Sequence, residues 1–184
     1  MTTEKGKCPA LCCLLPIILF YALSCYGGIS FAADPVKQDV VTVHTLWPAA
    51  AAHPGDHVTL KIVVDISKGW HIIADEGQVG AFNDFKPYPT RIHVSEAAEE
   101  MTIDPVRFPP ARAIDVGFAG GRLMSFRGRS VFEVPIRLEK QIPPGLIPLK
   151  VELAYQACSK KICLFPQTVT LETVLRVIDE EPIQ

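Results

Sequence analysis

Regular alternation of apolar and polar residues constrains the fold of this chain most. Through residues 58–66 apolar side chains occupy every second position, with polar residues such as Thr59 and Asp65 between them. Successive side chains of a β-strand point to opposite faces, so this period indicates a half-buried strand. Residues 54–56 (Pro-Gly-Asp) and 68–69 (Lys-Gly) form typical turn sequences on either side. The segment therefore predicts a strand between two turns.

Similar patterns predict a chain that is β throughout. The other predicted strands are residues 40–47, 91–94, 131–138, 149–157 and 168–177. Pro135 has no N–H to donate, so its strand is expected at a sheet edge or with a bulge. Residues 95–101 (SEAAEEM) are the one helical candidate and are too short to organise a fold. Strands separated by proline- and glycine-rich turns favour an all-β, immunoglobulin-like β-sandwich.

Residues 108–128 differ from the rest in composition. They contain two prolines and four glycines around Phe118, Leu123 and Phe126. A long glycine-rich loop with exposed aromatic residues is more often functional or mobile than structural. We therefore predict a functional loop here.

The N-terminus has the pattern of a secretory signal peptide. Lys5 and Lys7 precede an apolar run at residues 11–23, and small residues surround Phe31. Cleavage after Ala32 is expected, which makes residues 1–32 the signal peptide. Two alternatives remain open: a retained membrane anchor, although the run is short and contains a proline, and lipoprotein processing at Cys25.

Signal removal leaves two cysteines, Cys158 and Cys163, in a single exported domain of residues 33–184. An even number of cysteines in an exported chain indicates a compartment that permits disulfides.

The cysteine pair has two main interpretations. Four residues separate Cys158 from Cys163, so a tight connection between strands can bring them within bonding distance. As a structural disulfide, so short a loop would contribute only roughly 2 kcal/mol in the chain-entropy model. The neighbouring Lys160 and Lys161 stabilise a thiolate, the reactive form in exchange. The local sequence therefore favours a redox-active disulfide over a structural one.

Other functional classes have little support. The histidines of the mature chain show no spacing to the cysteines that suits zinc or copper, so no metal site is expected. His71, next to Trp70, is expected to pack at the start of a strand. No nucleotide-binding loop or hydrolase motif is present, and we expect no cofactor. A net charge of −2 without a long basic stretch argues against nucleic-acid binding.

Three segments resemble one known family. The string YQACSKKICLFP, which runs from Tyr155 and Gln156 through both cysteines to Pro166, resembles the active-site hairpin of the N-terminal periplasmic domain of DsbD, the thiol:disulfide interchange protein. KGWHI at residues 68–72 is similar to the Gly-aromatic signature of that family, and FRGRSVFEVPIRL at residues 126–138 is similar to the strand after its cap loop.

The resemblance implies an immunoglobulin-like domain in the periplasm that carries one redox disulfide. It also implies electron transfer, as a protein-disulfide reductase, to thioredoxin-fold oxidoreductases of the DsbC, DsbG or cytochrome c maturation type. In that family a phenylalanine on a cap loop covers the cysteines. Phe118 is the best match to it, and Asp115 is the nearest acidic residue. By resemblance, Cys163 attacks the substrate disulfide and Cys158 resolves the intermediate.

The chain also departs from the family pattern. Well-known members have five residues between the cysteines, whereas this chain has four. No membrane domain or C-terminal thioredoxin-like domain follows, so a separate membrane thiol transporter is expected to supply the electrons. The same departure favours the alternative of a binding or scaffold module with a structural disulfide. A metal-binding protein is a third, weaker alternative.

Overall fold

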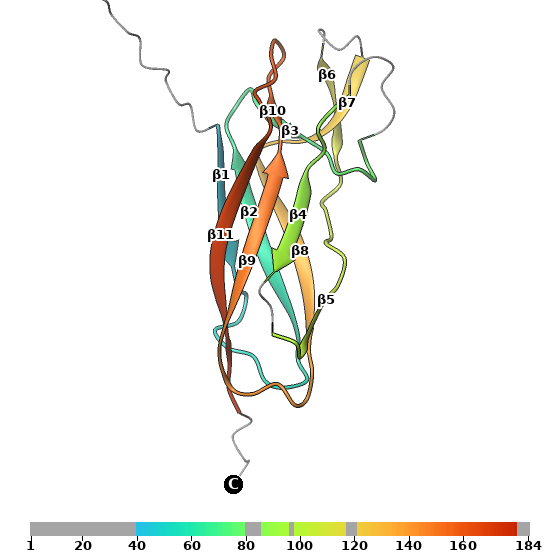
Figure 1. Ribbon diagram of the computed structural model, residues 1–184. Helices are drawn as coiled ribbons and strands as arrows, with labels where there is room; N and C mark the ends of the chain where they lie inside the picture. Colours follow the sequence, from blue (N-terminus) through green and yellow to red (C-terminus); the bar gives the residue numbers. More distant parts are fainter. Residues whose placement is uncertain (1–39, 80–85, 96–97, 117–120, 180–184) are drawn as a thin grey trace, which may run out of the picture. The chain divides into compact units, whose positions relative to one another are not determined.

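The regular secondary structure consists of β-strands. A computed structural model describes residues 40–79, 86–95, 98–116 and 121–179, all within one unit of residues 38–184. The strands are β1 (Val41–Leu46), β2 (His57–Ile66), β3 (His71–Ile73), β4 (Arg91–Ser95), β5 (Met101–Ile103), β6 (Arg112–Val116), β7 (Gly121–Phe126), β8 (Arg129–Leu138), β9 (Gly145–Tyr155), β10 (Ala157–Cys158) and β11 (Gln167–Val177) (Figure 1).

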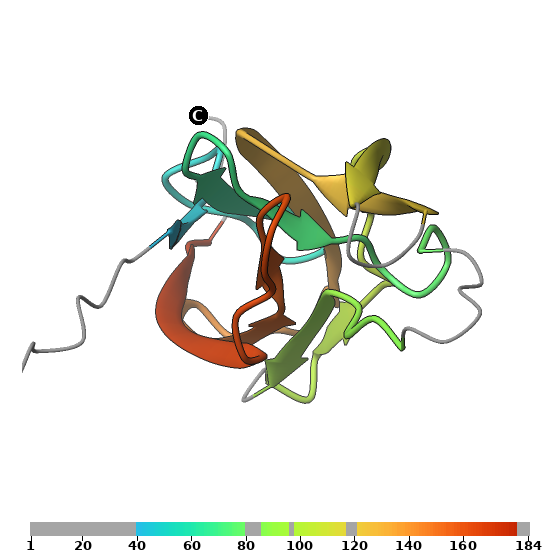
Figure 2. The same ribbon diagram turned by 90° about the horizontal axis from the view of Figure 1, so that it is seen from above.

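These strands form three antiparallel sheets. One sheet has the order β1-β2-β8-β5, a second β11-β9-β4, and a third β10-β3-β7-β6. The first two sheets face each other as the layers of a sandwich, and the third lies at one end of it (Figures 1 and 2). We call the third sheet the end sheet.

The main core lies between the two facing sheets. Each strand directs alternate side chains inward, as period-two spacing requires. The inward residues with 1% exposure or less include Leu60, Ile62, Val64, Phe132, Val134, Ile136, Leu149, Val151 and Leu153. The chain is therefore the all-β, immunoglobulin-like sandwich that the strand pattern predicts.

Each predicted strand overlaps an observed one, but the helix predicted at residues 95–101 is wrong. Ser95 ends β4, which pairs with β9, and Met101 begins β5, which pairs with β8. A helix this short is unstable in isolation, so strand pairing on both sides decides the local structure. Within the part of the chain that the structure describes, no helix is long and apolar enough to cross a membrane.

The loop predicted at residues 108–128 is largely a pair of strands. β6 and β7 pair antiparallel from Arg112 with Ser125 to Val116 with Gly121. Phe126, an aromatic residue predicted to be exposed, is buried, as is Leu123, and the Phe126 ring lies 5.2 Å from the Phe132 ring. Packing against the core outweighs the low strand propensity of a glycine-rich segment.

Of the two positions expected for Pro135, an edge strand and a bulge, the edge strand is wrong. β8 is an inner strand, and Pro135 pairs with Thr59 of β2. On the other side, the Pro135 carbonyl accepts a hydrogen bond of 2.9 Å from the amide of Asp104, the residue after β5. The missing N–H faces this same side, because the N–H and C=O of a strand residue point the same way. The ladder to β5 has ended there, so β8 accommodates the proline.

Candidate redox site

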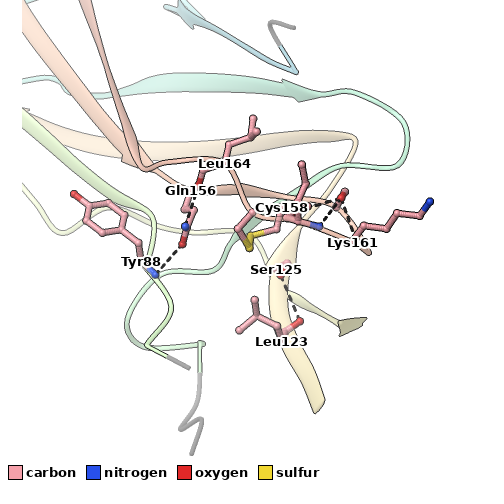
Figure 3. The surroundings of a disulfide bond; sticks show 10 residues. Tyr88, Leu123, Ser125, Gln156, Cys158, Lys161 and Leu164 are labelled. Atoms are coloured by element: carbon pink, nitrogen blue, oxygen red, sulfur yellow. Dashed lines mark hydrogen bonds between the residues drawn. A yellow bond between two sulfur atoms is a disulfide. The ribbon is translucent and has the colours of Figure 1, made fainter. Parts of the chain in front are cut away.

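The cysteines lie in a short hairpin at the end of the sandwich. Strand β10 carries Cys158, the chain turns, and Cys163 pairs back against Cys158. The Ser159 amide donates to the Ile162 carbonyl at 2.7 Å, and the Leu164 amide donates to the Ala157 carbonyl at 2.8 Å. We call residues 157–164 the cysteine hairpin. Figure 3 shows its surroundings.

Cys158 and Cys163 are joined by a disulfide. The two flanking hydrogen bonds place them opposite each other as a non-hydrogen-bonded pair, the position at which antiparallel strands approach most closely. Their Cα atoms are 4.0 Å apart and their sulfur atoms 2.02 Å apart. Formation and reduction of this bond therefore involve two neighbouring positions of one hairpin rather than two distant parts of the chain.

Ser159 holds the tip of the hairpin. Its Oγ accepts hydrogen bonds of 3.2 Å from the amides of Lys161 and Ile162. Ser and Thr hydroxyls often stabilise tight turns in this way. Lys160 and Lys161, the two lysines singled out in the sequence, occupy the tip and are exposed to solvent.

The two cysteines differ in exposure. Cys158 is 0% exposed, whereas Cys163 is only partly buried. Cys158 packs in a small apolar cluster with Ile73, Val116 and Leu123, separate from the main core. A reagent or partner that approaches from solvent therefore reaches Cys163 first.

Gln156 fastens the base of the hairpin to its neighbours. Its Nε2 donates to the Leu164 carbonyl at 3.0 Å, and its Oε1 accepts from the Tyr88 amide at 3.4 Å (Figure 3). The adjacent Tyr155 is buried, and its hydroxyl donates to Oε1 of Gln167 at 3.3 Å. Both near-site residues thus position the hairpin, and neither forms its surface.

Apolar side chains project into solvent on the side of Cys163. Ile162 is 56% exposed and Phe165 is 90% exposed. Pro166, predicted to lie near the site, follows Phe165 and is also exposed. Large apolar groups next to a reactive position are typical of a surface that contacts another protein.

Of the two residues predicted for the cap loop, the structure describes one, Asp115. Asp115 lies in β6, opposite Arg122 of β7, and is exposed. Phe118 lies outside the described residues, so its role as the cap phenylalanine stays a prediction. The described neighbours of that segment, Val116 and Leu123, do contact the buried cysteine through the apolar cluster.

His71 adjoins the site, which sequence analysis did not reveal. As expected, it is buried and begins a strand, after a turn in which Gly69 adopts a φ of +87°. Its position opposite Cys158 in the end sheet was unexpected. Burial lowers the pKa of the His71 imidazole below its ordinary value, because the charged form is desolvated. The two residues are far apart in sequence, so only the strand register brings them together.

The described part of the chain contains no group of three or more His, Cys, Asp or Glu side chains arranged to hold a metal ion.

Comparison with known families identifies the domain. The family model described as "Thiol:disulfide interchange protein DsbD, N-terminal" matches residues 37–175. The chain belongs to the DsbD N-terminal family. Membership of this family connects the chain with thiol:disulfide interchange. A search of curated proteins gave no match.

Solved structures similar to this DsbD N-terminal family member include two bacterial periplasmic domains. The N-terminal periplasmic domain of ScsB from Proteus mirabilis is 20% identical, with a TM-score of 0.46, and the match covers 73% of this chain and 46% of that one. The reduced N-terminal domain of DsbD from Neisseria meningitidis is 14% identical, with a TM-score of 0.42, over 73% of this chain and 85% of that one. This chain thus spans about half of the ScsB chain.

Proposed function

We propose that this protein is a periplasmic thiol:disulfide carrier that passes reducing equivalents to other oxidoreductases through Cys158 and Cys163. The observation that carries the proposal is the unequal exposure of two bonded cysteines in one short hairpin. An accessible sulfur can be attacked or can attack, and a shielded neighbour can complete the exchange. Membership of the DsbD N-terminal family supports the same chemistry.

The proposed reaction has two steps. In the reduced protein the Cys163 thiolate attacks a partner disulfide, which forms a mixed disulfide and releases one partner sulfur as a thiolate. Cys158 then attacks the sulfur of Cys163, which reforms the internal disulfide and releases the second partner sulfur. The partner gains two electrons and this protein loses two. Lys160 and Lys161 favour the thiolate that begins the exchange.

The proposed partners are thioredoxin-fold oxidoreductases of the DsbC, DsbG or cytochrome c maturation type. Exposed Ile162 and Phe165 beside Cys163 offer an apolar contact surface for such a partner. A separate membrane thiol transporter is the proposed electron donor. Identification of the partner trapped in the experiment below distinguishes an oxidoreductase of cytochrome c maturation from one of the DsbC or DsbG type.

Export is part of the proposal. We propose that residues 1–32 are removed as a signal peptide and that residues 33–184 act in the periplasm. Mass spectrometry of the protein recovered from a periplasmic fraction tests this, because an N-terminus at Ala33 supports cleavage after Ala32. A lipid-modified N-terminus at Cys25 would instead indicate lipoprotein processing.

Trapping tests the exchange reaction. With Cys158→Ala, Cys163 can form a mixed disulfide that the protein cannot resolve, so a covalent complex with a thioredoxin-fold partner should accumulate. Cys163→Ala is the matched control, because the remaining cysteine is buried and should trap little. Failure of Cys158→Ala to capture a partner from a periplasmic extract would count against the carrier role.

A redox titration separates the carrier from a binding module with a structural disulfide. Structural disulfides of exported proteins stay oxidised down to about −300 mV or below, and exchanging ones are reduced at higher potentials. A midpoint above about −300 mV supports the carrier, and a lower midpoint supports the binding module.

A further inference from the structure

Three residues of the site form one row across neighbouring strands. His71 in β3 lies opposite Cys158 in β10, and Cys158 lies opposite Cys163 on the returning arm of the hairpin. Directly opposed residues of antiparallel strands place their side chains on the same face of the sheet, with Cβ atoms about 5 Å apart. Cys158 therefore has the disulfide partner on one side and an imidazole on the other.

The described residues show no structural role for the polar group of the His71 imidazole. His71 is 3% exposed, and its Nε2 has no hydrogen-bond partner in the described structure. A buried polar nitrogen without a partner costs free energy, and such groups in native proteins often have a functional role. An imidazole nitrogen without a partner next to a redox cysteine is therefore a candidate for proton transfer.

Burial favours a neutral imidazole at His71. The other residues of the cluster around Cys158 are apolar: Ile73, Val116 and Leu123, with Val79 and Ile114 packed against them. Ser125, the β7 partner of Ile73, is uncharged. The charged residues on the neighbouring segments are at least partly exposed and of both signs, and they include Lys68 before β3, Asp75 and Glu76 after it, Asp115 in β6, Arg122 in β7, Arg127 after β7, and Lys160 and Lys161 at the hairpin tip. Burial is the cause that lowers the pKa of His71, so near neutral pH the ring is unprotonated and can accept a proton.

Cys158 needs such an acceptor if it resolves mixed disulfides. A thiol surrounded by apolar groups ionises poorly, because the thiolate is desolvated, and only the thiolate attacks disulfides efficiently. Cys158 is fully buried in apolar surroundings. The exposed lysines at the tip lie on the solvent side, where Cys163 is accessible.

We propose that His71 accepts the thiol proton of Cys158 during resolution of the mixed disulfide, an inference that rests on the proposed carrier function. The proton moves from Sγ of Cys158 to the free nitrogen of the imidazole. The Cys158 thiolate then donates its electron pair to Sγ of Cys163, and the bond between Cys163 and the partner sulfur breaks. The partner leaves as a thiolate, and the imidazolium returns its proton to that thiolate through solvent. His71 ends neutral and ready for the next cycle.

Stopped-flow reaction with 5,5′-dithiobis(2-nitrobenzoate) separates the two steps. Attack by Cys163 on this small disulfide releases one coloured thiolate, and resolution by Cys158 releases a second. His71→Gln keeps a polar group of similar reach but removes the basic nitrogen. We expect an unchanged first release and a second release slowed about a hundredfold, the lower end of the range for a lost general base.

The pH profile adds a readout that a purely structural role would not change. In the wild type the second release should vary little across neutral pH, because the imidazole supplies the base. In His71→Gln it should fall about tenfold for each pH unit below the thiol pKa. His93→Gln, at an exposed position of β4, is the matched control and should behave like the wild type.

The outcomes are distinguishable. Wild-type and His71→Gln proteins with the same second-release rate and pH profile would overturn the role of His71 and leave the carrier function intact. Lack of a second release from the wild type would contradict resolution by Cys158, and with it the proposed function. Because His71→Gln can disturb folding, NMR titration of His71 in Cys163→Ser and in the Cys158→Ser/Cys163→Ser double variant provides a second test. Loss of the Cys158 thiol should shift the imidazole titration, and an unchanged curve would overturn the proposal.

Discussion

Individual residues determine how this site divides its tasks. Cys163 is accessible and Cys158 is enclosed, although they lie in one hairpin and are directly bonded. Gln156 holds the base of the hairpin through its contacts with Leu164 and Tyr88. The site therefore combines one accessible cysteine at the surface with a shielded neighbour.

Burial of His71 also predicts a pH dependence of stability. Because its pKa is lowered in the folded state, the unfolded chain binds more protons just below the ordinary histidine pKa of about 6.5. The free energy of unfolding should therefore fall as pH decreases through that value. The His71→Gln variant should lose less of its free energy of unfolding over the same pH change. Urea denaturation of both oxidised proteins at about pH 7.5 and about pH 5 measures the difference. A difference between the two proteins that is independent of pH would contradict this.

At the scale of strands and turns, the hairpin acts as a presenting element. Ile162 within the hairpin and Phe165 directly after it lie in solvent near Cys163, at the end of the sandwich. Exposed apolar side chains add nothing to the main core, so their contribution is expected in contact with a partner.

Phe165→Ser should weaken that contact without changing the chemistry of the cysteines. We expect exchange with a folded thioredoxin-fold partner to slow about fivefold or more, as for loss of an important interface side chain. Reaction with the small aromatic disulfide should stay unchanged. Leu146→Ser is the control, because Leu146 is similarly exposed (71%) but lies at the opposite end of β9 from the hairpin. Equal effects of the two substitutions would contradict a docking role for Phe165.

The sequence predicted the long strands and the cysteine hairpin because both have local signals. Alternation along β2 and β8 is visible in any short window, and Cys158 and Cys163 are close in the chain. By contrast, β6 and β7 lie among glycines and prolines that predict a loop, and their pairing depends on contacts such as that of Phe126 with the core. The position of His71 beside Cys158 depends on the register of β3 with β10, for which neither segment has a local signal.

For the molecule as a whole, the disulfide is a minor source of stability. It closes a loop between residues separated by five positions, so it restricts the unfolded chain only slightly. The main core between the facing sheets does not include either cysteine. A carrier that alternates between dithiol and disulfide must stay folded in both states, and this arrangement allows it.

Reduction should therefore leave the domain folded. We expect the free energy of unfolding to fall by no more than about 2 kcal/mol on reduction, the chain-entropy value for so short a loop. Urea denaturation of the oxidised and reduced proteins, monitored by circular dichroism, measures this change. Unfolding on reduction at room temperature would indicate instead that the disulfide is structural.

Strand β7 contributes side chains to two apolar clusters. One face contacts the cluster around Cys158, and the other face contacts the main core. Leu123 contacts the cluster around Cys158, whereas Phe126 packs against Phe132. The amide hydrogens of β7 and β3 should therefore exchange with solvent as slowly as those of β2 and β8, because exposure of the β7 and β3 amides requires global unfolding. The amides at the hairpin tip should exchange rapidly in either redox state. Motion at the hairpin tip should thus leave the sheet beneath it cooperative with the rest of the fold.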